Sequence, residues 1–123
     1  MKFAEDHNSS RYKISGYDSA SIGINGKPHD FALVLSPMEI ITDWSPNTYA
    51  DLRAEHLDPF YLLNAEIILL GTGQKQIFPP PDILRRFAQE QIGFEIMDTQ
   101  AACRTFNILM AEGRNVVAGL FIE

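Results

Sequence analysis

The chain has 123 residues, of which 46% are hydrophobic and 21% charged, a size and balance that suit one globular domain and exclude two separate cores. The apolar fraction also excludes wholesale disorder. Sixteen acidic against ten basic side chains give a net charge of -6. Because this charge repels phosphate backbones and anionic lipids, nucleic acids and membrane surfaces are poor candidate partners.

Neither a targeting segment nor a membrane span is predicted. The first ten residues include Glu5, Asp6 and His7 without an apolar run, so we expect residues 1–10 to be a frayed tail and 11–123 to form a single domain. The longest apolar stretch, residues 67–70, is far shorter than the roughly 20 residues that a spanning helix requires. A single cysteine excludes an internal disulfide and fits a reducing compartment. We therefore expect a soluble, cytoplasmic protein.

The N-terminal half is predicted to be rich in β-strands. Residues 12–25 alternate loosely between apolar and polar, which predicts half-buried strands with a turn near Asp18. The dipeptide Asn25-Gly26 accepts the positive φ angles of a type I′ turn and so predicts a hairpin. Further strands are expected over 31–35 and 39–44, because each apolar run ends at a Ser-Pro pair.

The middle of the chain changes character. A helix is predicted over about 49–56, with Asn47 or Thr48 as its cap and Asp58-Pro59 as the break that interrupts it. Residues 66–70 are predicted to form a strand covered on both faces, because they are almost continuously apolar.

The last part of the chain alternates helices and strands. Three prolines at 79–81 precede an apolar helical stripe, and Gly93 is expected to end that helix. A strand over 94–97 follows, then a helix that Asp98 or Thr99 caps and Gly113 ends, then a strand over 116–122. The order strand-helix-strand-helix-strand implies parallel pairing in this half. The predicted fold class is therefore α/β: one three-layer domain with a mixed central sheet.

The loop Gly71-Thr72-Gly73 is the strongest candidate for a binding site. It follows an apolar strand and precedes a helix, which is where open α/β sheets place ligands. Asp98 lies about 25 residues beyond Gly73, near the place of a ribose-binding acid in a dinucleotide fold. However, a third glycine is missing because position 76 is Gln, and no Gly-Lys-Ser/Thr follows. A tight turn is therefore favoured over nucleotide binding.

Two other groups of residues favour structural roles. Cys103 lies among apolar helix positions, and Arg104 points about 100° away from it, so a buried thiol is favoured over a nucleophile. The cluster of Asp51, Glu55, His56 and Asp58 lacks the tight paired spacing of zinc ligands and is interpreted as a solvated helix face. No catalytic residue, metal site or cofactor is assigned.

Thr105 and Asn107 are polar residues in the middle of the last predicted helix, where neither has a capping role. A polar side chain without a local function indicates a contact elsewhere in the fold or with a ligand.

Several segments together resemble one small-domain family. They are the glycine loop at 69–73, the proline-led helix, residues 92–99 with Ala102, residues 105–109, and residues 112–114. The family includes mitochondrial respiratory complex I assembly factor 3 and uncharacterised bacterial and archaeal proteins. The resemblance implies a three-layer α/β domain with a mixed sheet, no established catalysis, and a shared polar feature at the sheet edge. The residues carried over to that feature are Gly71, Thr72, Gly73, Asp98, Thr99, Thr105 and Asn107.

Three functional hypotheses follow. The leading one is a non-enzymatic module that holds a protein partner, as an assembly factor does. The alternative is a small-molecule or anion-binding protein, with enzymatic activity left open, whose site lies at Gly71-Thr72-Gly73. The third is a homodimer formed through the apolar hairpin region and an exposed strand edge.

Overall fold

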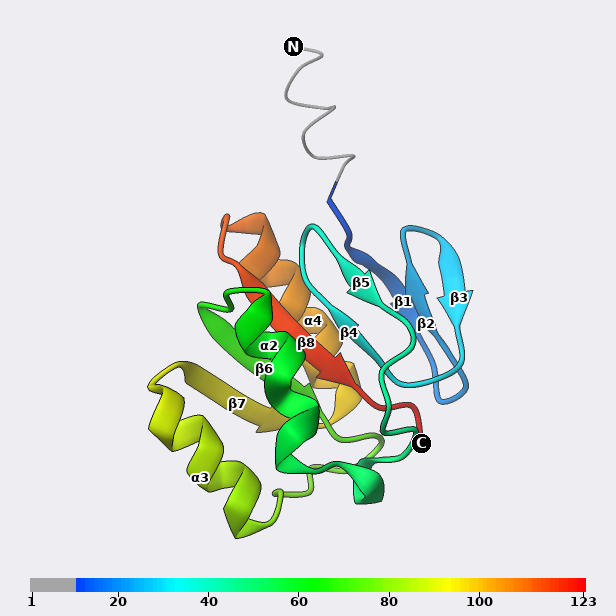
Figure 1. Ribbon diagram of the computed structural model, residues 1–123. Helices are drawn as coiled ribbons and strands as arrows, with labels where there is room; N and C mark the ends of the chain where they lie inside the picture. Colours follow the sequence, from blue (N-terminus) through cyan, green and yellow to red (C-terminus); the bar gives the residue numbers. More distant parts are fainter. Residues whose placement is uncertain (1–10) are drawn as a thin grey trace.

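Eight short strands form two sheets in the computed structural model, which describes residues 11–123. The tail expected over 1–10 lies outside the described residues. The small antiparallel sheet contains β1 (Ile14–Tyr17), β2 (Ile22–Ile24) and β3 (Lys27–His29). The large sheet has the order β5-β4-β8-β6-β7 and is built from β4 (Leu33–Leu35), β5 (Ile40–Ile41), β6 (Ile67–Gly71), β7 (Gly93–Met97) and β8 (Val116–Leu120) (Figure 1).

The large sheet is mixed, as predicted. β6 pairs in parallel with both β7 and β8, whereas β4 is antiparallel to β8 and β5 is antiparallel to β4. The parallel pairs are the ones joined through helices, because a strand that returns in the same direction needs a long crossover connection. The strands β7 and β5 form the two edges of this sheet.

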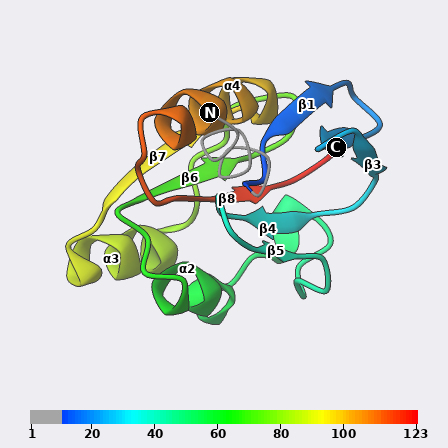
Figure 2. The ribbon, with the colours of Figure 1, turned by 90° about the horizontal axis from the view of Figure 1, so that it is seen from above.

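Three layers result from covering both faces of the large sheet. Helix α4 (Thr99–Ala111) and the small sheet cover one face, and helices α2 (Asp58–Leu62) and α3 (Pro81–Glu90) cover the other (Figure 2). Successive residues of a strand point to opposite faces, so Leu69 packs beneath α4 while Ile68 packs on the side of α2 and α3. This confirms the prediction of a strand that is buried on both faces.

The helix predicted over 49–56 is wrong. The structure has two short 3-10 helices, η1 (Tyr49–Asp51) and η2 (Ala54–Leu57), separated where Leu52 adopts extended backbone angles. Thr48 does precede η1, but its hydroxyl donates to the Asp51 side chain (3.0 Å) instead of capping the backbone. Asp58-Pro59 begins α2 rather than interrupting a helix, because proline lacks an N–H and is tolerated in the first helical turn.

The predicted end of the proline-led helix is also wrong. Gln91, at φ 57°, adopts the left-handed conformation that ends α3, and Gly93 is the first residue of β7. Gly113 does follow α4 and has φ 81°, in line with its predicted role. The strand expected over 39–44 is limited to two residues, Ile40–Ile41.

No helix within residues 11–123 combines the length and the apolar character needed to cross a membrane.

Candidate functional site

The glycine loop and the first turn of α4 lie against each other at the carboxyl ends of β6 and β7. The Thr99 amide donates to the Gly73 carbonyl oxygen (2.8 Å), and the Gly73 amide donates to the Thr99 hydroxyl oxygen (2.8 Å). The same hydroxyl donates to the Phe121 carbonyl oxygen (2.6 Å). Because parallel strands end at one edge of a sheet, segments about 25 residues apart meet there.

Gly71 and Gly73 have structural reasons to be glycine. A Cβ atom at Gly71 would lie 3.0 Å from the Thr99 Cα atom, so the absence of a side chain lets α4 pack closely on β6. Gly73 has φ 102°, and a Cβ atom there would lie 2.9 Å from the Glu123 Cγ atom. The structure therefore gives one glycine a packing role and the other a turn role.

The polar side chains of this loop are also occupied within the chain. The Thr72 hydroxyl donates to the Lys75 carbonyl oxygen and accepts from the Ile77 amide (3.1 Å), which holds the loop in its compact shape. Asp98 caps α4, because its Oδ1 atom accepts from the Ala101 amide (2.8 Å). The sequence left this cap open between Asp98 and Thr99.

The backbone amides of the loop do not form an anion cradle. The Thr72 amide donates to Met97 (2.9 Å), the Gly73 amide to Thr99, and the Gln74 amide to Glu123 (3.1 Å). Anion-binding loops instead direct several free N–H groups at the ligand. The amides of Thr72, Gly73 and Gln74 are thus all hydrogen-bonded within the chain.

Asn107 and Thr105 lie away from the loop and face opposite sides of α4. Asn107 Oδ1 accepts from the Ile14 amide (2.8 Å) and its Nδ2 donates to the Ile14 carbonyl oxygen (2.7 Å), so this side chain pairs with β1 as a neighbouring strand does. The Thr105 hydroxyl lies 3.6 Å from the Met97 sulfur, on the side of β7. Of the seven predicted residues, Gly71, Thr72, Gly73, Asp98 and Thr99 are brought together, and these two are not.

A groove of about 340 Å³ lies between the β1–β2 turn and the start of α4. Its lining residues are Tyr17, Asp18, Ser19, Gly73, Gln74, Asp98 and Gln100. Burial raises the pKa of the Tyr17 hydroxyl, and nearby Cys103, Asp98 and Asp18 raise it further. A groove with two carboxylates suits a hydrogen-bond donor or a cation better than an anion.

Cys103 lines an adjoining hollow of about 230 Å³, together with Asn107. Its side chain is only 4% exposed, and burial raises the pKa of the thiol to about 12; Arg104 opposes this rise and Asp98 adds to it. Because the thiolate is the reactive form, this thiol is a poor nucleophile at neutral pH. The predicted burial of Cys103 is confirmed.

Within residues 11–123, no three His, Cys, Asp or Glu side chains are grouped closely enough to share a metal ion.

The outer edge of β7 is a second candidate site that the sequence motifs did not indicate. The Met97 carbonyl group faces β6, since it accepts from the Thr72 amide (2.9 Å). Backbone groups alternate in direction along a strand, so those of Phe94 and Ile96 point away from β6. The Gln76 side chain reaches the Ile96 carbonyl oxygen from outside (2.9 Å).

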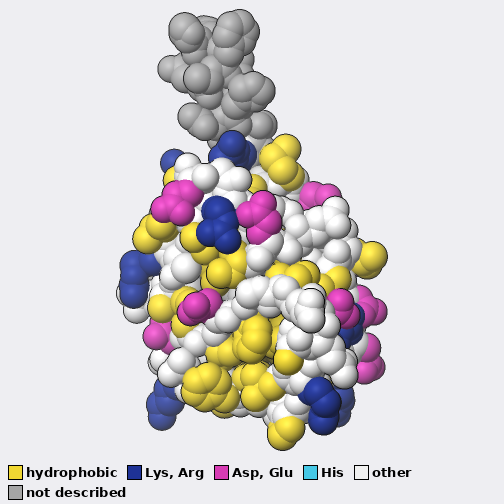
Figure 3. All heavy atoms as spheres, turned by 90° about the vertical axis from the view of Figure 1, so that its left-hand side faces the viewer, with side chains coloured by type: hydrophobic (Ala, Val, Ile, Leu, Met, Phe, Trp, Pro, Cys, Tyr) yellow, Lys and Arg dark blue, Asp and Glu magenta, His cyan; other side chains and the backbone are white. Residues whose placement is uncertain are grey.

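Exposed apolar side chains lie near this edge. Phe78, 66% exposed, and Ile77, 49% exposed, follow Gln76 in the loop between β6 and α3. Ile108 on α4 is not part of this group, because it lies about 200° around the helix from the buried residues Phe106 and Met110 and so faces solvent, away from the sheet. Figure 3 shows hydrophobic side chains gathered on the lower part of this side of the molecule. We call the β7 edge with Ile77 and Phe78 the β7 face.

One sequence signal, not used in the prediction, points to this face. Phe78 directly precedes three prolines, in a segment that cannot be a strand interior.

Comparison with known proteins places the fold in a recognised group. Residues 14–121 match the model of a family described as protein of unknown function (DUF498/DUF598). A crystal structure of a Bordetella parapertussis protein superposes with a TM-score of 0.85 at 35% identity and covers 93% of this chain and 98% of that one.

Two curated relatives have names that differ in what they suggest. A "13 kDa major membrane protein" of Francisella tularensis is 33% identical over 94 residues, which are 76% of each chain. The Bos taurus "NADH dehydrogenase [ubiquinone] 1 alpha subcomplex assembly factor 3" is 34% identical over 109 residues, which cover 87% of this chain but only 59% of the relative. With most of its length matched, the chain belongs to the family of proteins of unknown function DUF498/DUF598.

Proposed function

We propose that this protein is a non-enzymatic protein-binding domain that holds a partner at its β7 face. The observation that carries the proposal is the position of Ile77 and Phe78, two exposed apolar side chains in the loop that Gln76 ties to the outer edge of β7. Single exposed apolar residues are normal, but a group beside a free edge is typical of an interaction site.

The loop that carries Ile77 and Phe78 is held in place before any partner arrives. The Tyr49 hydroxyl donates to the Ile77 carbonyl oxygen (2.6 Å), and the Ile77 amide donates to the Thr72 hydroxyl oxygen. Pro80, at φ -65° and ψ 163°, stiffens the segment that leads into α3. A preorganised loop loses little conformational entropy on binding, which favours affinity.

The relatives support a role in assembly. The name of the Bos taurus relative describes a factor that assembles an enzyme complex, and such a factor acts by binding other proteins. The described residues of the present chain contain no group of potential metal ligands, and the buried Cys103 thiol is a poor nucleophile. Partner binding is thus the activity that the relatives and the surface both favour.

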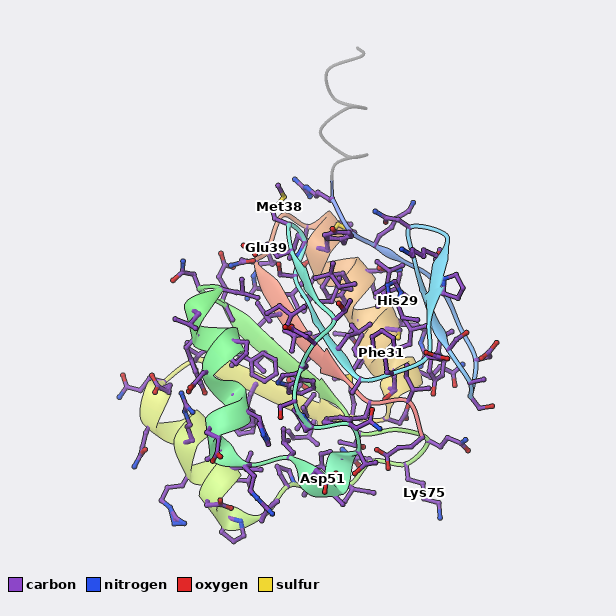
Figure 4. The ribbon with its side chains drawn as sticks, turned by 45° about the vertical axis from the view of Figure 1, so that its right-hand side comes forward. His29, Phe31, Met38, Glu39, Asp51 and Lys75 are labelled. Atoms are coloured by element: carbon purple, nitrogen blue, oxygen red, sulfur yellow. The ribbon has the colours of Figure 1, made fainter. Side chains whose placement is uncertain are left out.

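The experiment compares purification of the tagged chain with that of two variants from the cells that produce it. Phe78→Ser combined with Ile77→Ser removes the two exposed apolar side chains of the β7 face. Met38→Ser is the matched control, since Met38 is equally exposed (64%) but lies on the β4–β5 turn, at the opposite edge of the sheet (Figure 4). We expect one protein to copurify in constant ratio with the wild type and the control, and the double variant to lose it by about tenfold or more.

The proposal is contradicted if no protein copurifies reproducibly. It is also contradicted if the double variant retains the partner as well as Met38→Ser does.

Small-molecule binding in the groove between Tyr17 and Asp98 is the alternative function, and the volume of about 340 Å³ is the observation that favours it. A ligand that binds only the folded protein raises its melting temperature. If this alternative holds, at least one compound in a panel of amines and neutral metabolites should raise the melting temperature, and Asp98→Asn should reduce that rise. If no compound raises the melting temperature, the alternative is contradicted.

A further inference from the structure

We infer that the partner binds as an extended segment that adds a strand to the outer edge of β7. This inference rests on the proposed function, because it specifies how the β7 face holds its partner. Strand addition uses main-chain hydrogen bonds for affinity and side-chain contacts on alternate faces for specificity.

The first support is the hydrogen-bonding capacity of the edge. Phe94 and Ile96 direct their backbone groups away from β6, and the Gln76 side-chain amide already donates to one of them, the Ile96 carbonyl oxygen. That amide stands where a backbone N–H of an added strand would lie. The edge can therefore accept a strand once the flexible Gln76 side chain moves aside.

The second support is the position of the apolar residues. The side chains of an added strand alternate between the two faces of the sheet. On one face they meet Phe94, which stacks on Phe87 at 4.5 Å between ring centroids, and on the other they meet Thr105 of α4, whose hydroxyl lies 3.6 Å from the Met97 sulfur. The edge therefore offers apolar contact on the Phe94 face and mixed polar and apolar contact on the α4 face.

The third support concerns charge and decides the kind of partner. Glu95 is exposed at the middle of β7 and points to the α4 face, opposite to Phe94 and Ile96. Two copies of this chain paired through β7 and centred on this residue would set their Glu95 carboxylates against each other, and each copy carries a net charge of -6. A different protein with a Lys or Arg between apolar residues fits this edge better than a second copy does.

The other edge of the large sheet does not offer an equivalent site. β5 contains only two residues, Ile40–Ile41, so an added strand would gain few hydrogen bonds there.

The experiment begins with p-benzoylphenylalanine, a photo-reactive residue, placed at position 78 or at position 105 of the full chain, because Thr105 is the α4 residue that contacts β7. After irradiation in cells, the cross-linked segments are identified by mass spectrometry. We expect both positions to capture the same protein and overlapping parts of one short segment with a basic residue among apolar ones. A failure of both positions to capture any protein contradicts the proposed function itself.

The captured segment is then synthesised as a peptide, together with a copy that is N-methylated at alternate residues. We expect the peptide to slow hydrogen exchange of the Phe94 and Ile96 amides by about tenfold or more, and the methylated copy to lose binding. Glu95→Lys is expected to weaken binding about tenfold, whereas Glu39→Lys, on the distant β4–β5 turn, leaves it unchanged.

Any one of three results would overturn strand addition while retaining partner binding. The first is that the two positions capture unrelated segments, and the second is that the methylated peptide binds as well as the parent peptide. The third is that the peptide leaves the exchange rates of the Phe94 and Ile96 amides unchanged. Capture of a second copy of this chain at both positions would overturn the inference that the partner is a different protein.

Discussion

The glycine loop with the start of α4 and the outer edge of β7 are neighbouring regions that use their polar groups in opposite ways. In the first region, Thr72, Thr99 and Asp98 bond almost entirely within the chain, and Thr99 is fully buried. In the second, the backbone groups of Phe94 and Ile96 face outward beside the exposed Ile77 and Phe78. The region that looks like a motif bonds within the fold, and the region without a motif directs backbone groups outward.

This difference follows from the cost of burial. A buried hydroxyl or amide must be hydrogen-bonded, so threonine and asparagine at a helix–sheet junction are required by the fold itself. An exposed strand edge is satisfied by water and needs no particular side chains, and its sequence therefore carries little signal. Substitutions in the first region should change stability, and substitutions in the second should change only binding.

The largest effect is expected from Thr99→Val. The change keeps the shape of the side chain but removes the acceptor of the Gly73 amide and the donor to the Phe121 carbonyl oxygen. Leaving two buried groups unpaired should lower the free energy of unfolding by about 2–4 kcal/mol, measured by urea denaturation. Thr105→Val is the matched control in the same helix, because its hydroxyl contacts only the Met97 sulfur, and we expect a change below about 0.5 kcal/mol.

Gly71→Ala should have the next largest effect. The new methyl group would lie 3.0 Å from the Thr99 Cα atom and 3.1 Å from the Ala102 Cβ atom, and α4 would have to move away from β6. Overpacking of this kind should cost about 1–3 kcal/mol in unfolding free energy. Gly16→Ala is the control, since no atom lies within 4 Å of its Cβ position. Equal stability of the two variants would disprove the packing role of Gly71.

A smaller effect is expected from pH. Burial raises the pKa of the Cys103 thiol from its ordinary value of 9.0 to about 12, so above pH 9.0 the unfolded chain releases a proton that the folded chain keeps. The folded state then binds more protons, and its stability falls as pH rises through this window, by about 1 kcal/mol at pH 10.

Denaturation at pH 7 and pH 10 measures this loss, and Cys103→Ala should reduce it. An unchanged difference between the two pH values in Cys103→Ala would show that other groups cause the decline. Both measurements stay at or below pH 10, because burial also raises the pKa of Tyr49 from 10.0 to about 12. At higher pH, ionisation of this tyrosine in the unfolded chain would add a similar loss of stability.

The smallest effect on stability is expected in the β7 face. Ile77→Ser and Phe78→Ser replace exposed side chains and should each change the unfolding free energy by less than about 0.5 kcal/mol. The same variants should lose the partner, so thermal denaturation and copurification are measured on one set of proteins. A large loss of stability in either variant would mean that its side chain serves the fold.

Local patterns predicted most elements well where their cause is local. The Asn25-Gly26 turn has the positive φ angles expected of it, and the apolar repeat of α4 placed Phe106 and Cys103 in the core. The helix expected over 49–56 was wrong, because extended backbone at Leu52 divides this segment. The segment is also tied to a distant residue, since Trp44 Nε1 donates to the His56 carbonyl oxygen. Tertiary contacts, absent from a local pattern, decided that segment.

The candidate site shows the same limit. The sequence identified Asn107 as a polar residue without a local function, but its partner, Ile14, lies 93 residues away. The family resemblance also assigned Thr105 and Thr99 to one polar feature, although their side chains face different neighbours.

The amino-acid sequence by itself determined the α/β class, the mixed sheet and the burial of its central strands, because hydrophobic periodicity and turn residues act over a few neighbours. Only the tertiary structure decided which polar groups are consumed inside the protein and which strand edge is left open. Those properties depend on atoms brought together from distant parts of the chain, and they separate the residues that hold the fold from those available to a partner.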